Sequence, residues 1–267
     1  MIAPARLLAV AALLFPLAAS PQGKGAKGKT EITWYGHAAF VIRTPGGTVL
    51  AVDPWFSNPK SPDAKAAETL ERVDYVLVTH GHSDHVGEAI ALAKRTKAKL
   101  VASFDLARAL VSAGFPKDQA GMDTSGNVGG RIQAGDATVI IVPALHSSTF
   151  AGGDGPAQPA GSPVGFVIQV KGGPTIYHTG DTDVTSDMRL IPERYGTVDV
   201  MLACIGGRFT MDPEAAAMAA TFVRPRQIVP MHWGTFPALT GTPDALAAAL
   251  EGRGKVVTLE PGKPAAF

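Results

Sequence analysis

The sequence contains very little cysteine, because Cys204 is the single thiol among 267 residues. One thiol cannot form a disulfide within the chain, so a disulfide-bonded scaffold is excluded and the fold must depend on its hydrophobic core. Cys204 itself lies in the apolar run 200–205, which predicts a buried strand.

An excess of charge of one sign is also missing, because 24 basic residues oppose 23 acidic ones and the net charge is +1. The body of the chain has no basic stripe, so we do not expect nucleic acid as a partner. With 46% hydrophobic and 18% charged residues, disordered and coiled-coil classes are excluded as well. The length suits one large globular domain or two closely packed halves.

The apolar run 7–19 near the N-terminus is short for a membrane span. Arg6 before it and small residues at its end are typical of a secretory signal peptide that is cleaved after Ala19 or Ser20. We therefore expect residues 1–19 to be the signal peptide of an exported, periplasmic protein without stable membrane insertion. An uncleaved anchor is the alternative. No cysteine follows the run, so lipid attachment there has no acceptor.

Residues 20–29 are rich in Gly and Lys and predict a flexible linker, followed by one folded domain over 30–267. Apolar periodicity and turn residues predict a mixed α/β class, with Asp212 as N-cap and Pro213 in the first turn of a helix. Two similar β-rich halves that pack their sheets together, with helices outside, would form a four-layer αββα sandwich. Strands are predicted at 31–35, 39–42, 48–52, 75–78, 99–102, 130–133, 137–142, 164–170, 175–177, 198–205, 227–230 and 255–259, and helices at 86–96, 104–113, 213–222 and 245–250.

A cluster of metal-ligating side chains follows the apolar run 75–78. His80, His82, Asp84 and His85 stand within six residues, which supplies enough nitrogen and oxygen ligands to begin a two-metal site. A strand end can direct the first two imidazoles toward one point, and a helix starting near Asp84 or His85 can turn the other two side chains toward a second. The alternative is a surface loop with chance histidines.

Three further candidates each close an apolar run elsewhere in the chain. His146 follows 139–142, Asp181 follows 175–180, and His232 follows 228–231. A sheet can hold a side chain rigidly at such a position, which is what a metal site requires.

In these motifs the sequence resembles the metallo-β-lactamase superfamily, whose ligand blocks occur here in order. Within it the chain is most similar to a widespread family of metal-dependent hydrolases related to ascorbate 6-phosphate lactonase. The similar stretches are 33–40, 53–55, 178–182, 205–211 and 230–237. The resemblance implies the αββα fold. The cysteine that many zinc β-lactamases use as a ligand has no counterpart in these blocks, which favours relatives such as lactonases and thioesterases.

The resemblance also implies a set of seven ligands around two metals. One metal would be held by His80, His82 and His146, the second by Asp84, His85 and His232, and Asp181 would bridge them. A hydroxide shared by the metals would be the nucleophile, and Asp84 would also orient it or carry its proton. We expect two divalent cations, Zn²⁺ first, with Mn²⁺ and iron as alternatives that these ligands do not distinguish.

Several other residues have both a functional and a structural interpretation. His37 is a candidate catalytic residue in the pocket or a buried structural histidine, and Asp53 orients a metal-bound imidazole or forms a turn beside proline. We favour a structural or wall role for His178. A plain turn is preferred to an anion site for 206–208, and the Gly/Pro-rich loop 151–163 is a pocket rim or a tolerated insertion.

Together these features predict an exported hydrolase with a dinuclear metal centre that acts on a small molecule. An ester-like bond is expected, and lactone, thioester, amide and phosphodiester substrates all stay open. The alternatives are a metal- or ligand-binding protein without catalysis and a mononuclear iron persulfide dioxygenase on the same scaffold. A homo-oligomer is neither indicated nor excluded.

Overall fold

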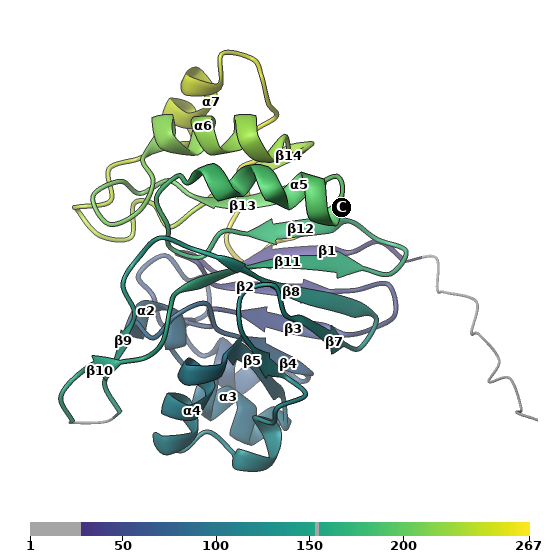
Figure 1. Ribbon diagram of the computed structural model, residues 1–267, viewed down its shortest axis with the longest axis vertical. Coiled ribbons are helices and arrows are strands. Elements are labelled where there is room, and N and C mark those ends of the chain that lie inside the picture. The colour runs from purple at the N-terminus through teal and green to yellow at the C-terminus, as the bar shows by residue number, and fades with distance from the viewer. Residues whose placement is uncertain (1–27, 153–154) are drawn as a thin grey trace, which may run out of the picture.

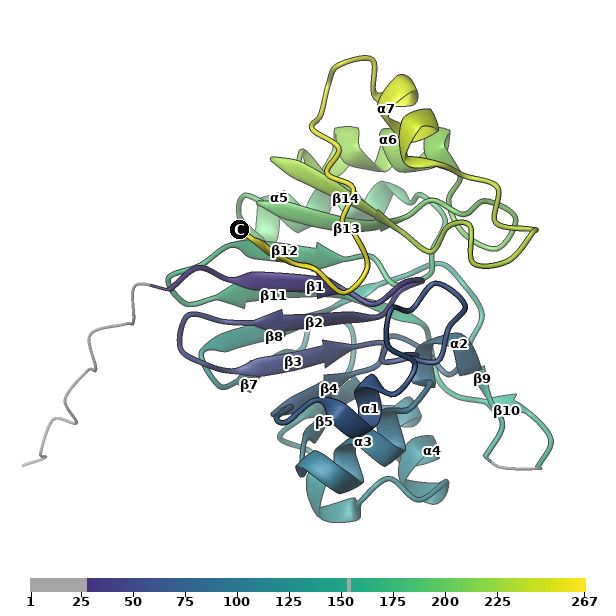
Figure 2. The same cartoon turned by 180° about the vertical axis from the view of Figure 1, so that it is seen from behind.

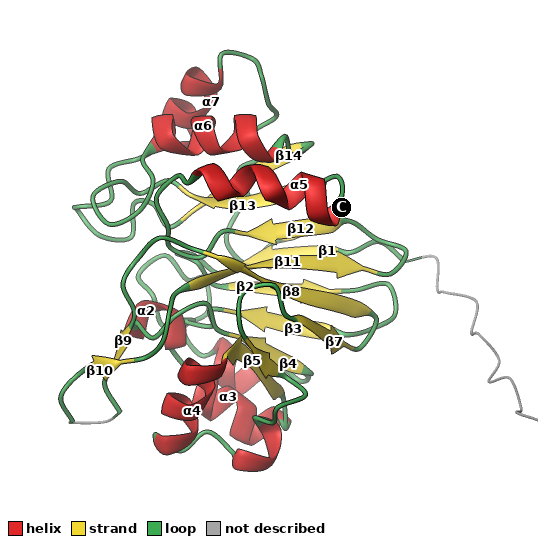
Figure 3. Ribbon diagram, in the orientation of Figure 1, coloured by secondary structure: helices red, strands yellow, loops and turns green. Residues whose placement is uncertain are grey.

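The computed structural model describes residues 28–152 and 155–267. The predicted signal peptide 1–19 and most of the predicted linker 20–29 lie outside these described residues. Two β-sheets lie one in front of the other, and helices cover the upper and lower ends of the molecule in Figure 1. Figure 3 shows the strands between the two groups of helices. The predicted αββα sandwich is therefore confirmed.

The first sheet faces the viewer in Figure 2, and its order differs from that of the chain because the last strand joins its edge. Along the sheet the strands are β15 (Pro264–Ala266), β1 (Glu31–Trp34), β2 (Phe40–Arg43), β3 (Val49–Val52), β4 (Tyr75–Leu77), β5 (Lys99–Ser103) and β6 (Ser125–Gly126). The chain thus returns to its first strand at its end.

The second sheet begins with parallel strands and continues antiparallel. Its order is β14 (Gln227–Met231), β13 (Val200–Cys204), β12 (Thr175–His178), β11 (Val164–Val170), β8 (Ala137–Pro143) and β7 (Arg131–Ala134). A separate two-stranded ribbon, β9 (Thr149–Phe150) with β10 (Gln158–Pro159), projects from the loop predicted at 151–163.

The alternation of side chains along a strand explains how the first sheet packs against helices with one face and against the second sheet with its other face. In β2, Phe40 and Ile42 enter the large core, whereas Val41 enters the core under the helices. The same division separates Leu50 from Val49 in β3. Successive side chains of a strand point to opposite faces, so one short apolar strand serves two cores.

The helices fall into two groups along the chain. The first contains α1 (Ala66–Thr69), α2 (Ser83–Val86), α3 (Ala89–Thr96) and α4 (Phe104–Ser112); the second contains α5 (Leu190–Tyr195), α6 (Pro213–Val223) and α7 (Pro243–Leu250), with 3₁₀ turns at Lys117–Gln119 and Ser186–Arg189. Asp212 caps α6 as predicted, since its side chain accepts a hydrogen bond from the backbone N–H of Ala215. Among residues 28–152 and 155–267, no helix combines the length and apolar character that crossing a membrane requires.

One predicted element has a different start and another is wrong. The helix predicted over 86–96 begins only at Ala89, because the backbone turns at Gly87, whose φ is +41° and where a Cβ would collide with the backbone of Pro54 and Trp55. The strand predicted over 255–259 is reduced to one bridge between Val256 and Ile228. Helices α1 and α5 and strand β15 were not predicted, because they are short and are held in place by tertiary packing.

Candidate metal centre

The seven candidate ligands come from loops that follow strand ends, and the fold brings them together. The segments after β4, β8, β12 and β14 supply them, with Asp84 and His85 in helix α2, and their ligand atoms form three overlapping groups, each within 4.8 Å. The groups are His80, His82 and His146; then His80, His85 and Asp181; then His37, Asp84, His85 and His232. His37 therefore joins the predicted residues as a member of the third group.

Three imidazoles form one side of the centre. Nε2 of His80 lies 2.9 Å from Nδ1 of His82, and the His146 ring lies 5.1 Å from each of the other two rings between centroids. Burial lowers the pKa of all three histidines, so they are neutral at pH 7 and have a lone pair available for a cation.

Asp181 lies between this trio and the second group of ligands. Its Oδ2 is 3.0 Å from Nε2 of His232, 3.3 Å from Nε2 of His85 and 3.7 Å from Nε2 of His146. The side chain is only 3% exposed. One carboxylate oxygen thus faces imidazoles from three separate loops, which is the position that a bridging ligand requires.

The orientation of His85 is set by a carboxylate on its far side. Nδ1 of His85 donates to Oδ2 of Asp53 over 2.8 Å, and Asp53 also accepts from the backbone N–H and hydroxyl of Thr79 over 2.8 and 2.7 Å. Burial opposes the charged imidazole, but the carboxylates of Asp181 and Asp53 raise the pKa of His85 well above its usual value. With Nδ1 engaged, Nε2 is directed toward Asp181.

His37 bridges two parts of the site through both ring nitrogens. Nε2 lies 3.1 Å from Oδ2 of Asp84, and Nδ1 lies 3.0 Å from the hydroxyl of Thr235. Since a carboxylate only accepts, Nε2 is the donor and Nδ1 accepts from Thr235. Burial lowers the pKa of His37 to about 4, against the opposite effect of the bond to Asp84, so the imidazole is neutral at pH 7.

Three residues of this centre have a strained backbone. His37, Asp53 and His232 have φ values of +50°, +44° and +55°, in the left-handed region that most residues avoid. Each such residue costs about 1–3 kcal/mol and persists only where its surroundings hold it. The backbone N–H of His232 donates to the carbonyl of His37 over 2.9 Å, which links two of the strained residues directly.

The buried polar atoms of the site fit a cation. Within the part of the chain that the structure describes, Nε2 of His85, Nε2 of His232 and Oδ1 of Asp181 are buried without a hydrogen-bond partner. Such atoms are costly unless something satisfies them. Imidazole nitrogens and carboxylate oxygens are the ligand types that zinc, manganese and iron accept. The donor set therefore suits divalent metal ions.

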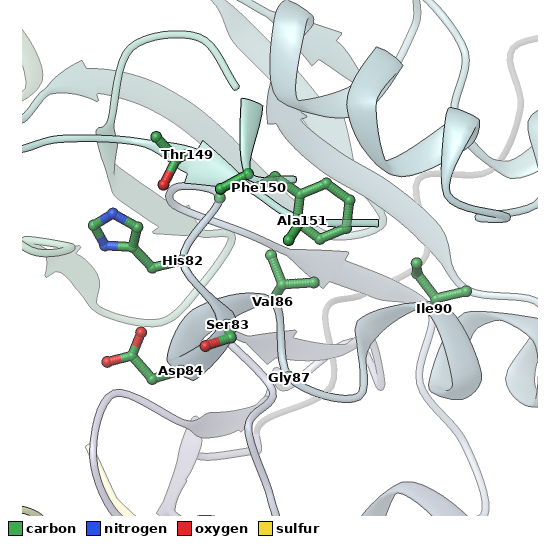
Figure 4. Close-up of a pocket in the computed structure, with 11 residues that line it drawn as sticks. His82, Ser83, Asp84, Val86, Gly87, Ile90, Thr149, Phe150 and Ala151 are labelled. Carbon is green, nitrogen blue, oxygen red and sulfur yellow. The ribbon is translucent and has the colours of Figure 1, made fainter. Parts of the chain in front are cut away.

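Two cavities open beside the ligands. The first, which we call the mouth cavity, has a volume of about 380 Å³ and is lined by His82, Asp84, His146, Ser147, Asp181, Phe209, His232, Phe236 and Leu239. The second, the flanking cavity of about 520 Å³, is lined by Gly81, His82, Ser83, Asp84, Val86, Gly87, Ile90, Thr149, Phe150, Ala151 and Ala157. In Figure 4, His82 and Asp84 lie at one end of the flanking cavity, and Val86, Phe150 and Ile90 lie toward the other.

The structure shows the surroundings of the residues for which the sequence allows both a functional and a structural interpretation. His178 is fully buried, accepts from the backbone N–H of Gly180 and faces the carbonyl of Ala38, which fits the structural role that we favour. Arg208 is exposed and lines neither cavity. Gly206 allows a close approach, because a Cβ there would collide with the carbonyl of His232. The 151–163 loop contributes Ala151 and Ala157 to the rim of the flanking cavity.

Several residues that support the centre were not among the predicted site residues. Thr79 and Thr235 bond the groups behind the ligands, and Phe150 and Ile90 line the flanking cavity. Thr79 stands next to His80 in the chain, but its contact with Asp53 spans 26 positions. Long-range pairs of this kind carry no local pattern.

The comparisons with known proteins agree with this geometry. Residues 31–232 match the family model described as a beta-lactamase superfamily domain. A metal-dependent hydrolase of Anaeromyxobacter sp. (strain K) is 69% identical over 248 residues, covering 93% of this chain and 90% of that protein. Another, from Thermodesulfovibrio yellowstonii, is 50% identical over 221 residues, covering 80% and 82%. A solved metallo hydrolase from Ignicoccus hospitalis has a TM-score of 0.76 at 33% identity, covering 90% of this chain and 99% of that one.

Proposed function

Because this chain belongs to the beta-lactamase superfamily and is a metal-dependent hydrolase, we propose that it holds two divalent cations and hydrolyses an ester-like bond. The observation that carries the proposal is the position of Asp181, whose Oδ2 lies within 3.0 to 3.7 Å of imidazole nitrogens from three loops. A single metal would leave one group of imidazoles without a ligand role.

Each proposed cation has its own group of ligands. One cation would be held by His80, His82 and His146, and the other by Asp84, His85 and His232. Asp181 would be a ligand of both cations. When bound, the cations would supply a hydroxide at neutral pH and polarise the bond that is broken. Zn²⁺ is our first choice, and Mn²⁺ and iron are compatible with the same ligands.

We assign the transfer of the proton to Asp84. Its Oδ2 accepts from His37, and its side chain is 27% exposed and lines the mouth cavity. A carboxylate at the wall of the cavity can accept a proton from the attacking nucleophile and pass it to the leaving group. His37, held by Thr235, is a positioning residue that fixes the carboxylate of Asp84 in one orientation.

Metal analysis combined with a substrate panel tests this function. The purified protein is stripped of metal, reconstituted with Zn²⁺, Mn²⁺ or Fe²⁺, and assayed with ester, lactone, thioester, amide and phosphodiester substrates. We expect two metals per chain and turnover of at least one ester-like class. One tightly held iron with oxygen consumption on a persulfide would overturn the hydrolytic proposal, and two metals without turnover would favour a binding role.

Asp181→Asn supplies the matched test of the bridge, with the exposed Asp187→Asn as control. We expect the first variant to lose at least one metal and about a hundredfold or more in kcat, because removing groups that stabilise charge at the reacting centre costs that much. The second variant should keep both metals and full activity.

The exported, periplasmic location is also a proposal, supported by the signal-like run at 7–19. Fractionation of cells that produce the full chain tests it. The expected result is a periplasmic protein that begins near residue 20, and a cytoplasmic protein that retains its N-terminus would contradict it.

A further inference from the structure

The mouth cavity has an apolar wall directly beside the ligands. Phe209 and Phe236 are 58% and 41% exposed, whereas Leu239 behind them is 2% exposed. Phe236 is stacked on Trp55 with ring centroids 5.8 Å apart and meets His37 edge-on at the same separation. Large aromatic surfaces left in water beside a reaction centre are typical of ligand-binding walls.

The flanking cavity continues this apolar character on the other side of the ligands. Val86, Ile90, Phe150 and Ala151 line it, and it shares His82 and Asp84 with the mouth cavity. A bond held at the centre would therefore have mainly apolar surface on both sides.

Away from the proposed metal centre, the described residues that line both cavities offer little that would recognise an anionic group. Of the described residues that line them, none is Lys or Arg. The glycine amides at the rim are already used, since Gly81 N–H donates to the Ser148 hydroxyl and Gly87 N–H donates to the carbonyl of Ser83. Phosphate and carboxylate groups are normally bound by Arg, Lys or free backbone N–H groups.

We propose that the substrate is an uncharged ester or lactone with an apolar chain, and that Phe209, Phe236 and Leu239 form the subsite for this chain. The proposal rests on the proposed hydrolytic function and narrows it, because it disfavours phosphorylated sugars and other substrates that carry an anionic group away from the reacting bond. Each methylene that enters the subsite gains the free energy of apolar burial, which corresponds to about a fourfold rise in kcat/KM.

The chain length of a p-nitrophenyl ester series measures this effect. With metal-loaded protein we expect kcat/KM to rise from the acetate through the butyrate to the octanoate. Phe209→Ala should lose most of that rise while keeping its metal content. Phe104→Ala is the matched control, because Phe104 is also an exposed phenylalanine, at 36%, but lines neither cavity.

A binding measurement tests the subsite without turnover. In calorimetry, N-ethyloctanamide should bind at least about tenfold more tightly than N-ethylacetamide, and Phe209→Ala should remove the difference, as expected for several buried methylenes. Thermal melts of each variant establish that it is folded.

The outcomes separate the two proposals. Hydrolysis with no dependence on chain length, or a preference for a phosphorylated lactone, would overturn the substrate class and leave the hydrolytic function standing. If no ester or lactone is hydrolysed, the proposed hydrolysis of ester-like bonds is overturned. The titration with the two amides then tests by itself whether the apolar subsite exists. Equal affinity for the two amides would overturn the subsite.

Discussion

Asp53 accepts a hydrogen bond from Nδ1 of His85 over 2.8 Å, and neither side chain exposes any surface to solvent. Thr79 donates to the same carboxylate twice, so Asp53 has three donors around it. This arrangement fixes which nitrogen of His85 faces the candidate metal centre. Carboxylates behind a ligating imidazole set its tautomer and orientation in this way.

Replacing Asp53 therefore tests the link between orientation and metal affinity. Asp53→Asn keeps the shape and tolerates the positive φ, but its amide cannot accept from all three donors. We expect affinity for the cation at His85 to fall about 10- to 100-fold. Competition with a chelator measures the change, and the exposed Asp118→Asn is the control. Unchanged affinity in Asp53→Asn would assign Asp53 to the turn alone.

A graded pair of variants tests the role of His37. His37→Ala removes the donor to Asp84, so we expect kcat to fall about tenfold or more while KM changes less, because Asp84 loses its fixed orientation. Thr235→Val removes only the hydrogen bond to the other ring nitrogen, so its effect on kcat should be smaller than that of His37→Ala. The loss of this hydrogen bond should lower the free energy of unfolding by about 1 kcal/mol. Steady-state kinetics and metal content report both effects. Equal losses in the two variants would contradict the positioning role.

Gly206→Ala tests the close approach beside His232. The added methyl would collide with the carbonyl of His232, so the loop must move and we expect a loss of about 1–3 kcal/mol in stability together with weaker metal binding. Gly254→Ala is the matched control, since its Cβ would make only ordinary contacts at 3.4 to 3.6 Å. Chemical unfolding measures stability, and a fully stable Gly206→Ala protein would show that the contact is relieved elsewhere.

Removal of metal should lower the stability of the whole protein. Several buried polar atoms at the centre lack partners among the described residues, and a bound cation satisfies them. Binding to the folded state stabilises it by about 2.7 kcal/mol at a free metal concentration a hundred times Kd. We expect a chelator to lower Tm and added Zn²⁺ to restore it, and Asp181→Asn to show a smaller shift. A Tm that is insensitive to the chelator would count against a resident metal.

Cys204 should be chemically inert in the folded protein. Burial raises the pKa of its thiol to about 11, so at pH 8 the thiol stays protonated, and the residue is fully buried in β13. We expect labelling by a disulfide reagent to be at least about a hundredfold slower than in the guanidinium-unfolded chain, because the thiolate is the reactive form. Rapid labelling of the native protein would indicate local opening of this strand.

Much of the fold follows from local patterns. The runs 164–170 and 137–142 are dense in apolar and β-branched residues, and both are strands in the structure with nearly the predicted bounds. The interrupted helix at Gly87 shows the limit of such patterns. The apolar periodicity from Ile90 to Ala93 predicts the helix that the structure has there, but the break at Gly87 accompanies a close approach of the Trp55 backbone, which lies far away in sequence.

By itself the sequence determined which ligand types are available and that each follows an apolar run, because these are properties of neighbouring residues. Only the tertiary structure decided that Asp181 faces three imidazoles, that His37 holds Asp84, and that Phe209 and Phe236 line the mouth cavity. It also paired β15 with β1 across the length of the chain. The physical reason is that these contacts join residues of different strands and loops, whose positions depend on sheet order and core packing, which no single stretch of sequence contains.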